Sequence, residues 1–425
     1  MTNMNRLKLE LDSLSIYRKV IRPQEKTMTK GLENNVPAIL YRIVCACAKG
    51  SKIDAGHWGE LFSELCRTNY SENLAGAIAE RILHDENIFT LAAVHESSSK
   101  LPENVLDAVR RDLQILQRFS ELTAADFISG GWDEDFINTL PQWKTGVSVR
   151  VLSGQWKECL SALEQFHKQN GCGIFAKYHA FLWRKGKMEP IAHIDSIRIA
   201  NLKGYERQRS LVLDNTQAFV EGYPANNTLL YGDRGTGKSS TIHALLNEFS
   251  GDGLRMIEMP KEYISEFPQL VAQIANIPLR FIVYIDDLSF TQGDDTFAGL
   301  KAVLEGGLSC KPENTLIYAT SNRRHLVRET HTERQGDDVS RGDTMQELLS
   351  LSDRFGLSIT FLNPDREKFY TILDGIAADR GLDIDTDLLH QHAEQWALSR
   401  GGRSPRVARQ YIDLVEGRIR RGLDF

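Results

Sequence analysis

The chain has 425 residues, of which 41% are hydrophobic and 25% charged, and its formal net charge is -6. This length predicts two or three domains, and the composition excludes a largely disordered chain and a surface that is basic throughout. The six cysteines form no C-x-x-C pair, and no early apolar run is long enough to cross a bilayer. We therefore expect a cytoplasmic protein with reduced thiols, without a zinc site or a disulfide framework, and with no membrane role.

Residues 1–195 are predicted to be mostly helical. Apolar residues recur at helical spacing in residues 39–47, 75–83, 105–122 and 155–167, with polar residues between them. We found no set of residues with catalytic spacing in this part of the chain. The pattern predicts a helical N-terminal domain over residues 1–195, whose surface is expected to bind an unidentified protein partner.

Strand and helix patterns alternate from residue 228 onward. Strands are predicted at 228–231, 254–259, 281–285, 315–319 and 358–361, and helices at 238–249, 263–275 and 297–308. Such alternation predicts a parallel sheet with helices on both faces, here an α/β domain over residues 196–363. Helices predicted at 366–379, 385–398 and 405–420 then form a small helical lid, the third domain, over residues 364–425.

Residues 232–239 match the phosphate-binding pattern G-x-x-x-x-G-K-S/T at every fixed position, between a predicted strand and a predicted helix. Glycines let backbone N–H groups converge on phosphate oxygens, and the helix N-terminus adds partial positive charge. Lys238 would reach the β- and γ-phosphates, and the Ser239 hydroxyl would ligate Mg²⁺. The predicted nucleotide-binding residues in this segment are Gly232, Asp233, Arg234, Gly235, Thr236, Gly237, Lys238, Ser239 and Ser240.

Two of the predicted strands end in polar side chains. The strand at 281–285 is followed by Asp286, which would hold Mg²⁺, and by Asp287, which would polarise the attacking water. The strand at 315–319 leads to Asn322, which could reach the γ-phosphate or the water, because ligands bind at the carboxyl ends of parallel strands. Considered alone, each group could instead close a strand into a turn or cap a helix.

The order of these motifs resembles that of the AAA+ ATPases, from Asn201 to the C-terminal end. Residues 231–240, 285–287, 319–322, 353–356 and 401–406 fall in the order Walker A, Walker B, sensor 1, arginine finger and sensor 2. More narrowly, the strings YGDRGTGKSS, DDLSF, YATSNRRHL, LSLSDRFGL and RGGRSPRVARQ resemble a bacterial AAA+ family known only as a domain of unknown function.

The resemblance implies roles for further residues. Arg354 is similar to an arginine finger that completes a neighbouring subunit's site; the alternative is a local ion pair with Asp353. Arg406 is similar to sensor 2, with Arg403 as the competing candidate. Tyr205 could stack on adenine or pack in the core.

These features predict an ATP- and Mg²⁺-dependent ATPase that hydrolyses ATP at the subunit interface of a homo-oligomer. Hydrolysis would drive remodelling or recruitment of the unidentified partner. The Asp-Asp pair is similar to that of replication-initiator and helicase-loader ATPases. A second hypothesis is therefore a nucleotide-gated loader or adaptor with little turnover, and the basic Arg323-Arg324 leaves association with DNA open.

Overall fold

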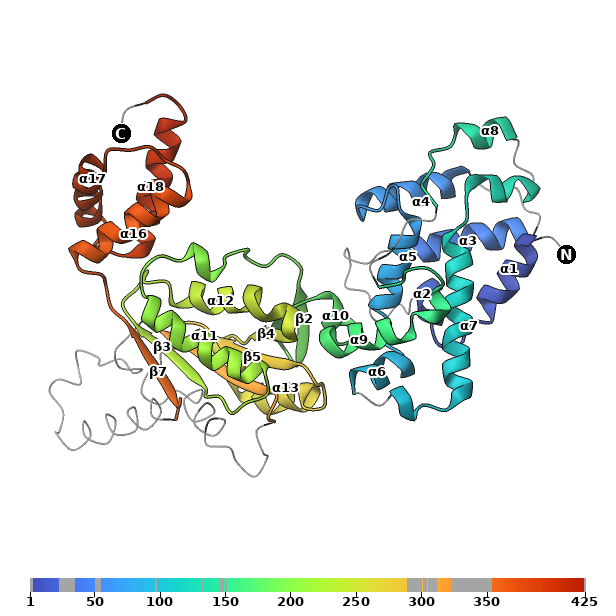
Figure 1. Ribbon diagram of the computed structural model, residues 1–425, viewed down its shortest axis with the longest axis horizontal. Coiled ribbons are helices and arrows are strands. Elements are labelled where there is room, and N and C mark those ends of the chain that lie inside the picture. The colour runs from blue at the N-terminus through green and yellow to red at the C-terminus, as the bar shows by residue number, and fades with distance from the viewer. Residues whose placement is uncertain are drawn as a thin grey trace. The chain divides into compact units, whose positions relative to one another are not determined.

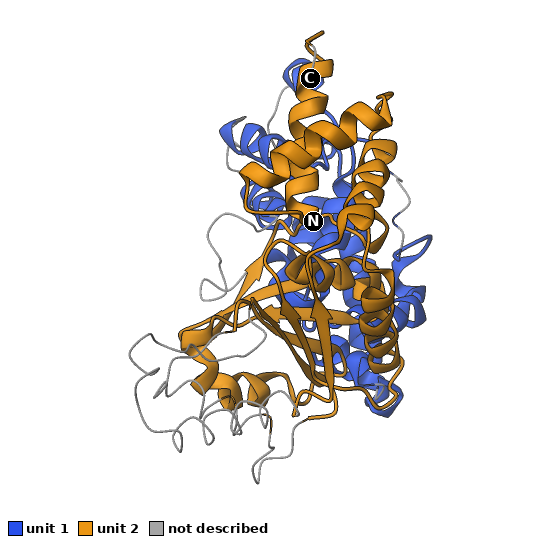
Figure 2. Ribbon diagram, turned by 90° about the vertical axis from the view of Figure 1, so that its left-hand side faces the viewer, with its two compact units in different colours: residues 1–177 blue, residues 178–425 orange. Residues whose placement is uncertain are grey.

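The computed structural model describes residues 3–22, 35–49, 55–95, 98–130, 134–145, 149, 151–288, 300, 304, 312–322 and 354–423. The chain divides into two compact units, residues 1–177 and 178–425, which Figure 2 distinguishes by colour. Within the described ranges, no helix is both long enough and apolar enough to span a membrane. The five cysteines in those ranges are all free.

The first unit is helical, as the sequence predicts (Figure 1). Its α-helices are α1 (Asn3–Asp12), α2 (Arg18–Ile21), α3 (Val36–Ala48), α4 (Ala55–Arg67), α5 (Leu74–Leu83), α6 (Ile88–Val94), α7 (Glu103–Ser120), α8 (Glu134–Thr139), α9 (Leu160–Asn170) and α10 (Ile174–Lys177). Short 3₁₀ turns lie at η2 (Ser98–Lys100), η3 (Ala124–Gly130) and η4 (Trp156–Glu158).

Large aromatic side chains hold the core of the first unit together. The Trp58 ring is fully buried, stacks on Trp143 with ring centroids 4.8 Å apart, and meets Phe127 edge-on. Its indole N–H donates to the Pro141 carbonyl, so the polar atom of this side chain is also satisfied. The apolar faces of α3, α4, α5 and α7 pack into the same cluster.

A buried histidine makes the first unit sensitive to acid. His167 is fully buried; its Nδ1 hydrogen-bonds the Gly171 carbonyl at 2.9 Å, and its Nε2 has no partner among the described residues. Burial lowers the pKa of His167 to about 4, although the bond to Gly171 opposes the shift. The folded ring therefore binds fewer protons than the unfolded one between about pH 6.5 and 4, and stability falls as the pH falls through this window.

We expect acidification from pH 7 to 5 to cost the region around α9 about 2 kcal/mol of unfolding free energy through His167. Hydrogen exchange of the α9 amides at both pH values measures this loss. His167→Gln, which can still donate to Gly171, should remove the part of the pH dependence that His167 causes; His84, whose pKa burial lowers to about 3, keeps its own part. An equal pH dependence in the variant and the wild-type protein would contradict the assignment.

The second unit contains a sheet and a group of C-terminal helices. Its strands are β1 (Ala180–Arg184), β2 (Lys187–Ile191), β3 (Thr228–Gly232), β4 (Leu254–Glu258), β5 (Arg280–Ile285), β6 (Thr315–Ser321) and β7 (Leu357–Phe361). Its helices are η5 (Ile199–Asn201), α11 (Glu206–Val220), α12 (Lys238–Phe249), η6 (Ser250–Asp252), η7 (Lys261–Glu266), α13 (Phe267–Ile274), α16 (Arg366–Asp379), α17 (Thr386–Ser399) and α18 (Pro405–Ile419).

Among the described residues the sheet has the strand order β2-β1-β4-β5-β6-β3-β7. All neighbouring pairs are parallel except β1 and β2, which form an antiparallel hairpin. The sequence pattern did not predict this hairpin, which lies before residue 196. Both turn residues, Lys185 and Gly186, have positive φ, as a tight two-residue hairpin turn requires. Glu266 fastens the turn by accepting hydrogen bonds from the Trp183 indole and the Gly186 amide.

Helices α11 and α12 lie side by side over one face of the sheet (Figure 1). Their apolar residues, including Val212 and Leu245, share one buried cluster with Leu230 of β3 and Tyr284 of β5. Helices α16, α17 and α18 form a separate cluster. Asp365, Asp385 and Ser404 cap the N-termini of these three helices through their side chains.

The predicted fold class is confirmed: a helical N-terminal part precedes a mostly parallel α/β sheet and C-terminal helices. All five predicted strands are present, and α12 and α16 have the predicted bounds. The helix predicted at 263–275 is divided into η7 and α13. The helix predicted at 297–308 lies outside the described residues except at Leu300 and Leu304, which are both helical.

Candidate functional site

The loop between β3 and α12 contains glycines whose backbone conformation would strain any larger residue. Gly232 has φ +127°, and a Cβ on it would lie 2.2 Å from the Phe361 carbonyl oxygen of β7. Gly237, which precedes the first turn of α12, has φ +93°. These conformations let the chain turn sharply from the carboxyl end of β3 into the start of a helix, where backbone N–H groups can meet an anion.

We expect Gly232→Ala to lower the free energy of unfolding by about 3 kcal/mol or more, because the methyl group meets backbone at a strained φ. Urea unfolding followed by circular dichroism measures the loss. Gly251→Ala is the matched control, since its Cβ would have no neighbour within 4 Å. That control should change stability by no more than about 0.5 kcal/mol. Similar losses in the two variants would contradict the close packing of β3 against β7.

Lys238 opens α12 and is buried, with only 5% of its surface exposed. Its Nζ donates to the carbonyl oxygens of Gly232 and Asp233 at 3.0 and 2.7 Å, and to Asn322 Oδ1 at 3.1 Å. Burial lowers the pKa of Lys238 to about 8, although Asp233, Asp287 and Asp286 oppose the shift. The ammonium group is therefore held next to the loop, and each of its three hydrogens donates a hydrogen bond.

Ser239 and Asp286 lie together next to Lys238. The Ser239 hydroxyl donates to Asp286 Oδ1 at 2.9 Å, and the Thr320 hydroxyl donates to the same oxygen. Burial opposes ionisation of Asp286, but the hydrogen bonds from Thr320 and Ser239, together with the neighbouring Tyr284 hydroxyl, outweigh it and hold the pKa of this carboxyl below its ordinary value. Asp286 is therefore an anion at neutral pH.

The residues around Asp286 fit a Mg²⁺ ion. A hydroxyl and an ionised carboxylate at hydrogen-bond distance are the hard oxygen ligands that this ion prefers. The Tyr284 hydroxyl, two residues earlier on the same face of β5, is buried without a hydrogen bond of good geometry although it neighbours Asp286, Ser239 and Thr320. Ser239 and Asp286 would hold the ion, which would neutralise phosphate charge.

Asn322 connects the lysine to the second acidic residue. Its Oδ1 accepts from Lys238 Nζ, and its Nδ2 donates to Asp287 Oδ1 at 2.7 Å. Asp287 has φ +48°, and its backbone N–H donates to the Thr320 hydroxyl at 3.0 Å. An aspartate tolerates this left-handed conformation better than most residues do. Residues from α12, β5 and β6 thus meet at one edge of the sheet.

The C-terminal helices touch this loop through the start of α18. The Arg406 backbone N–H donates to the Gly235 carbonyl at 3.1 Å, and a Cβ on Gly235 would lie 3.0 Å from the Ser404 hydroxyl. The Arg406 side chain is exposed and forms no ion pair with any described residue. Its charge still lowers the pKa of Lys238 slightly. The competing candidate, Arg403, instead pairs with Glu394 of α17.

Arg354 lies at the amino-terminal ends of the strands, whereas the loop lies at their carboxyl ends. It comes three residues before β7, whose carboxyl end at Phe361 pairs with Gly232 of the parallel strand β3. The length of β7 alone separates the amino ends of the strands from their carboxyl ends by about 13 Å. Arg354 is therefore not part of the site formed by its own loop. Its proposed alternative partner, Asp353, lies outside the described residues.

The other predicted residues are distributed around the loop. Asp233 Oδ2 accepts from the Asn363 backbone N–H at 2.8 Å, and the buried Thr236 hydroxyl donates to the Asp233 carbonyl. Arg234 is exposed, and Ser240 is half-buried in the first turn of α12. Arg323 and Arg324 lie outside the described residues.

Tyr205 packs within the fold near the loop. Its ring stacks on Phe361 with centroids 5.3 Å apart, and its hydroxyl donates to the Leu362 carbonyl at 2.6 Å. Burial raises the pKa of Tyr205 to about 12. In the structure, therefore, Tyr205 packs against the core, which is one of the two roles predicted for it.

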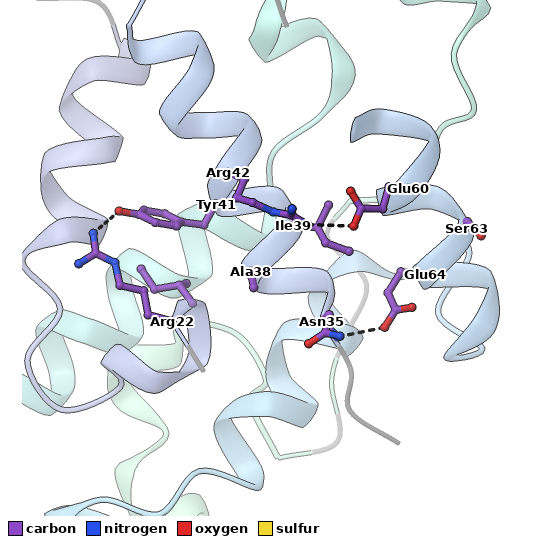
Figure 3. A pocket seen from close by; sticks show the side chains of 10 residues that line it. Arg22, Asn35, Ala38, Ile39, Tyr41, Arg42, Glu60, Ser63 and Glu64 are labelled. Atoms are coloured by element: carbon purple, nitrogen blue, oxygen red, sulfur yellow. Dashed lines mark hydrogen bonds and ion pairs between the residues drawn. The ribbon is translucent and has the colours of Figure 1, made fainter. Parts of the chain in front are cut away.

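A separate pocket of about 620 Å³ lies in the first unit (Figure 3). Its charged side chains already have partners: Arg42 pairs with Glu60 at 2.9 Å, and Glu64 accepts from the Asn35 amide and pairs with Arg67. Arg22 binds the Tyr41 hydroxyl and a neighbouring aspartate, Asp12. Among the described residues that line the pocket, every charged side chain therefore has a partner.

Comparison with known proteins adds to this geometry. The model of a family described as "Protein of unknown function (DUF815)" matches residues 176–419, more than half of the chain. The chain belongs to this family. The matched region begins close to the second compact unit and includes the β1–β2 hairpin. The family description assigns no activity.

The chain is also similar to a 26S proteasome regulatory subunit 4 homolog from Encephalitozoon cuniculi (strain GB-M1), with 28% identity over 129 residues. The alignment spans 26% of this chain and 30% of that protein, less than a third of the relative's length. Together with the family match, it supports a relationship to the AAA+ ATPases.

Proposed function

We propose that this protein binds ATP and Mg²⁺ at the β3–α12 loop and hydrolyses ATP at an interface between identical subunits. The observation that carries the proposal is the chain of contacts from Lys238 through Asn322 to Asp287, beside the Ser239–Asp286 bond. A cation, a carboxylate with a hydroxyl, and a second carboxylate are the groups that phosphoryl transfer to water requires. The AAA+ relationship supports the same reading.

In this proposal the residues have distinct roles. Lys238 and the loop amides bind the phosphates, and Asp287 orients and polarises the attacking water. Asn322 holds the Asp287 side chain in position relative to Lys238 through its two hydrogen bonds. Arg406 binds the nucleotide from the C-terminal helices. Arg354 of a neighbouring subunit offsets the charge that develops on the γ-phosphate. The first unit, which lies outside the family match, would bind the protein that is remodelled or recruited.

Isothermal titration of ATP with Mg²⁺, together with a phosphate-release assay, tests the nucleotide site. Lys238→Ala should weaken ATP binding roughly 10- to 100-fold, the value of a charge-assisted hydrogen bond or two. Lys187→Ala, an exposed lysine on β2, serves as the control and should bind ATP normally. Unaltered ATP affinity in Lys238→Ala, or no binding by the wild-type protein, would end the proposal.

One observation favours a second candidate, a nucleotide-gated loader or adaptor with little turnover. The side chain of Asp287 is short and is already bonded to Asn322, which restrains it from reaching a water beyond the γ-phosphate. ATP occupancy would then set an assembled state, and hydrolysis would be slow. Mass photometry with ATP and with a slowly hydrolysed analogue separates the two. Assembly with both, at negligible phosphate release, supports the loader.

A further inference from the structure

A second buried cation lies against the phosphate-binding loop. Arg209, in the first turn of α11, has only 4% of its surface exposed. A Cβ on Gly237 would lie 3.9 Å from Arg209 Nη2, the one described atom within 4 Å of that position outside Gly237 and its two chain neighbours. The guanidinium therefore borders the loop at the point where α12 begins. Its positive charge is opposite in sign to the acidic side chains of Asp286 and Asp287, which follow β5.

The hydrogen bonds of Arg209 involve only neutral acceptors. Nη1 donates to the Leu202 carbonyl at 2.7 Å and Nη2 to the Lys203 carbonyl at 3.2 Å, whereas Nε is buried without a partner. Within the described residues no carboxylate forms an ion pair with it. The Tyr205 ring, 6.0 Å from the guanidinium carbon, adds only a weak cation–π contact. Two carbonyls satisfy part of its hydrogen bonding, and the nearby Glu206, which forms no ion pair with it, compensates its charge only in part.

The surroundings of Arg209 make this arrangement costly. The N-terminus of α12 carries partial positive charge, and Lys238 is the next residue after Gly237. A buried cation without a carboxylate is ordinarily destabilising, and a nearby helix N-terminus and ammonium group add repulsion. Burial also lowers the pKa of Arg209 to about 10, with partial opposition from Glu206 and Tyr205. An anion at this place would relieve all of these costs.

We propose that Arg209 is a further nucleotide-binding residue, whose charge is neutralised by the phosphate chain of ATP bound at the loop. This inference rests on the proposed function and adds a binding residue that none of the sequence motifs contains. Arg209 would also hold the carbonyls of Leu202 and Lys203 beside the nucleotide, so that one side chain joins this segment to the phosphate site.

The structure supplies a matched control for this proposal. Arg255, near the amino end of β4, is fully buried and donates from Nη1 to the carbonyls of Ser250 and Leu254. Burial lowers its pKa to about 10 as well. Arg255 thus resembles Arg209 in burial and in bonding to two carbonyls. It lies near the amino ends of the strands, whereas the loop lies at their carboxyl ends.

The test is titration of ATP and of ADP into the full chain with Arg209→Gln, Arg209→Lys or Arg255→Gln, at low and high salt. We expect Arg209→Gln to weaken both nucleotides roughly 10- to 100-fold and to flatten the salt dependence of affinity. Arg209→Lys, which keeps the charge, should stay within about threefold of wild type. Arg255→Gln should bind both nucleotides as the wild-type protein does.

Three results would overturn the inference: unchanged affinity in Arg209→Gln, equal losses in the Gln and Lys variants of Arg209, or an equal loss in Arg255→Gln. Equal losses in the two Arg209 variants would mean that the shape of the guanidinium fixes the 202–203 segment and that its charge does not bind phosphate. Failure of the proposed function is distinguishable, because the wild-type protein itself would then bind neither nucleotide.

Discussion

Arg354→Ala is expected to reduce steady-state ATP hydrolysis by about 1,000-fold, the lower range for removal of an arginine finger, while ATP affinity stays within a few-fold. The reason is position: Arg354 lies at the amino-terminal edge of β7, and the loop that would bind its own subunit's ATP lies at the carboxyl edge. Arg354 can therefore act only on a nucleotide that another subunit holds.

Mixing supplies the decisive form of this experiment. Arg354→Ala keeps an intact phosphate site, and Lys238→Ala keeps an intact Arg354, so a mixed assembly should recover part of the phosphate release that neither variant shows alone. Arg280→Ala is the control, because Arg280 begins β5 at the same edge of the sheet and contacts Phe219 and Glu313 of its own chain. Full activity of Arg354→Ala by itself would exclude a shared site.

Asp287→Asn is expected to lower the catalytic rate by roughly 100- to 10,000-fold with ATP binding preserved, because an amide cannot polarise water as a carboxylate does. This substitution removes the carboxylate without straining the backbone, since asparagine also tolerates the φ of +48° found here. Phosphate release under single-turnover conditions, with ATP affinity measured in parallel, gives both quantities.

Asn322→Ala accompanies this variant as a comparison. It removes the link between Lys238 and Asp287 without removing either charge, so its rate should fall less than that of Asp287→Asn. If the wild-type protein and Asp287→Asn release phosphate equally slowly, Asp287 is not a base. The loader hypothesis would then explain why both proteins bind ATP without turnover.

Much of the second unit could be predicted because its signals are local. Buried parallel strands are continuous apolar runs, and five of them were found by that pattern alone. The hairpin was missed because its turn begins with Lys185, which is unusual at a positive φ, and because Pro190 interrupts β2. Proline is tolerated there since β2 is an edge strand.

The site could be predicted only as a set of motifs. Asp286, Asp287 and Asn322 follow strands whose carboxyl ends meet, so their proximity follows from the parallel sheet. The pairing of Arg403 with Glu394 depends on how α17 meets the start of α18, which no spacing reveals. Arg209 was missed because the sequence around it, Arg207-Gln-Arg-Ser210, is typical of a solvated helix face.

The β1–β2 hairpin determines where the chain can be shortened. A fragment beginning at residue 196 keeps every motif but lacks the strand that pairs with Met256, Ile257 and Glu258 of β4. The apolar β4 would then carry a row of unpaired backbone groups, a template on which a second copy can add. Such fragments would associate with or without ATP, and this association would hide any assembly that depends on the nucleotide. A fragment beginning at Tyr178 keeps that edge covered.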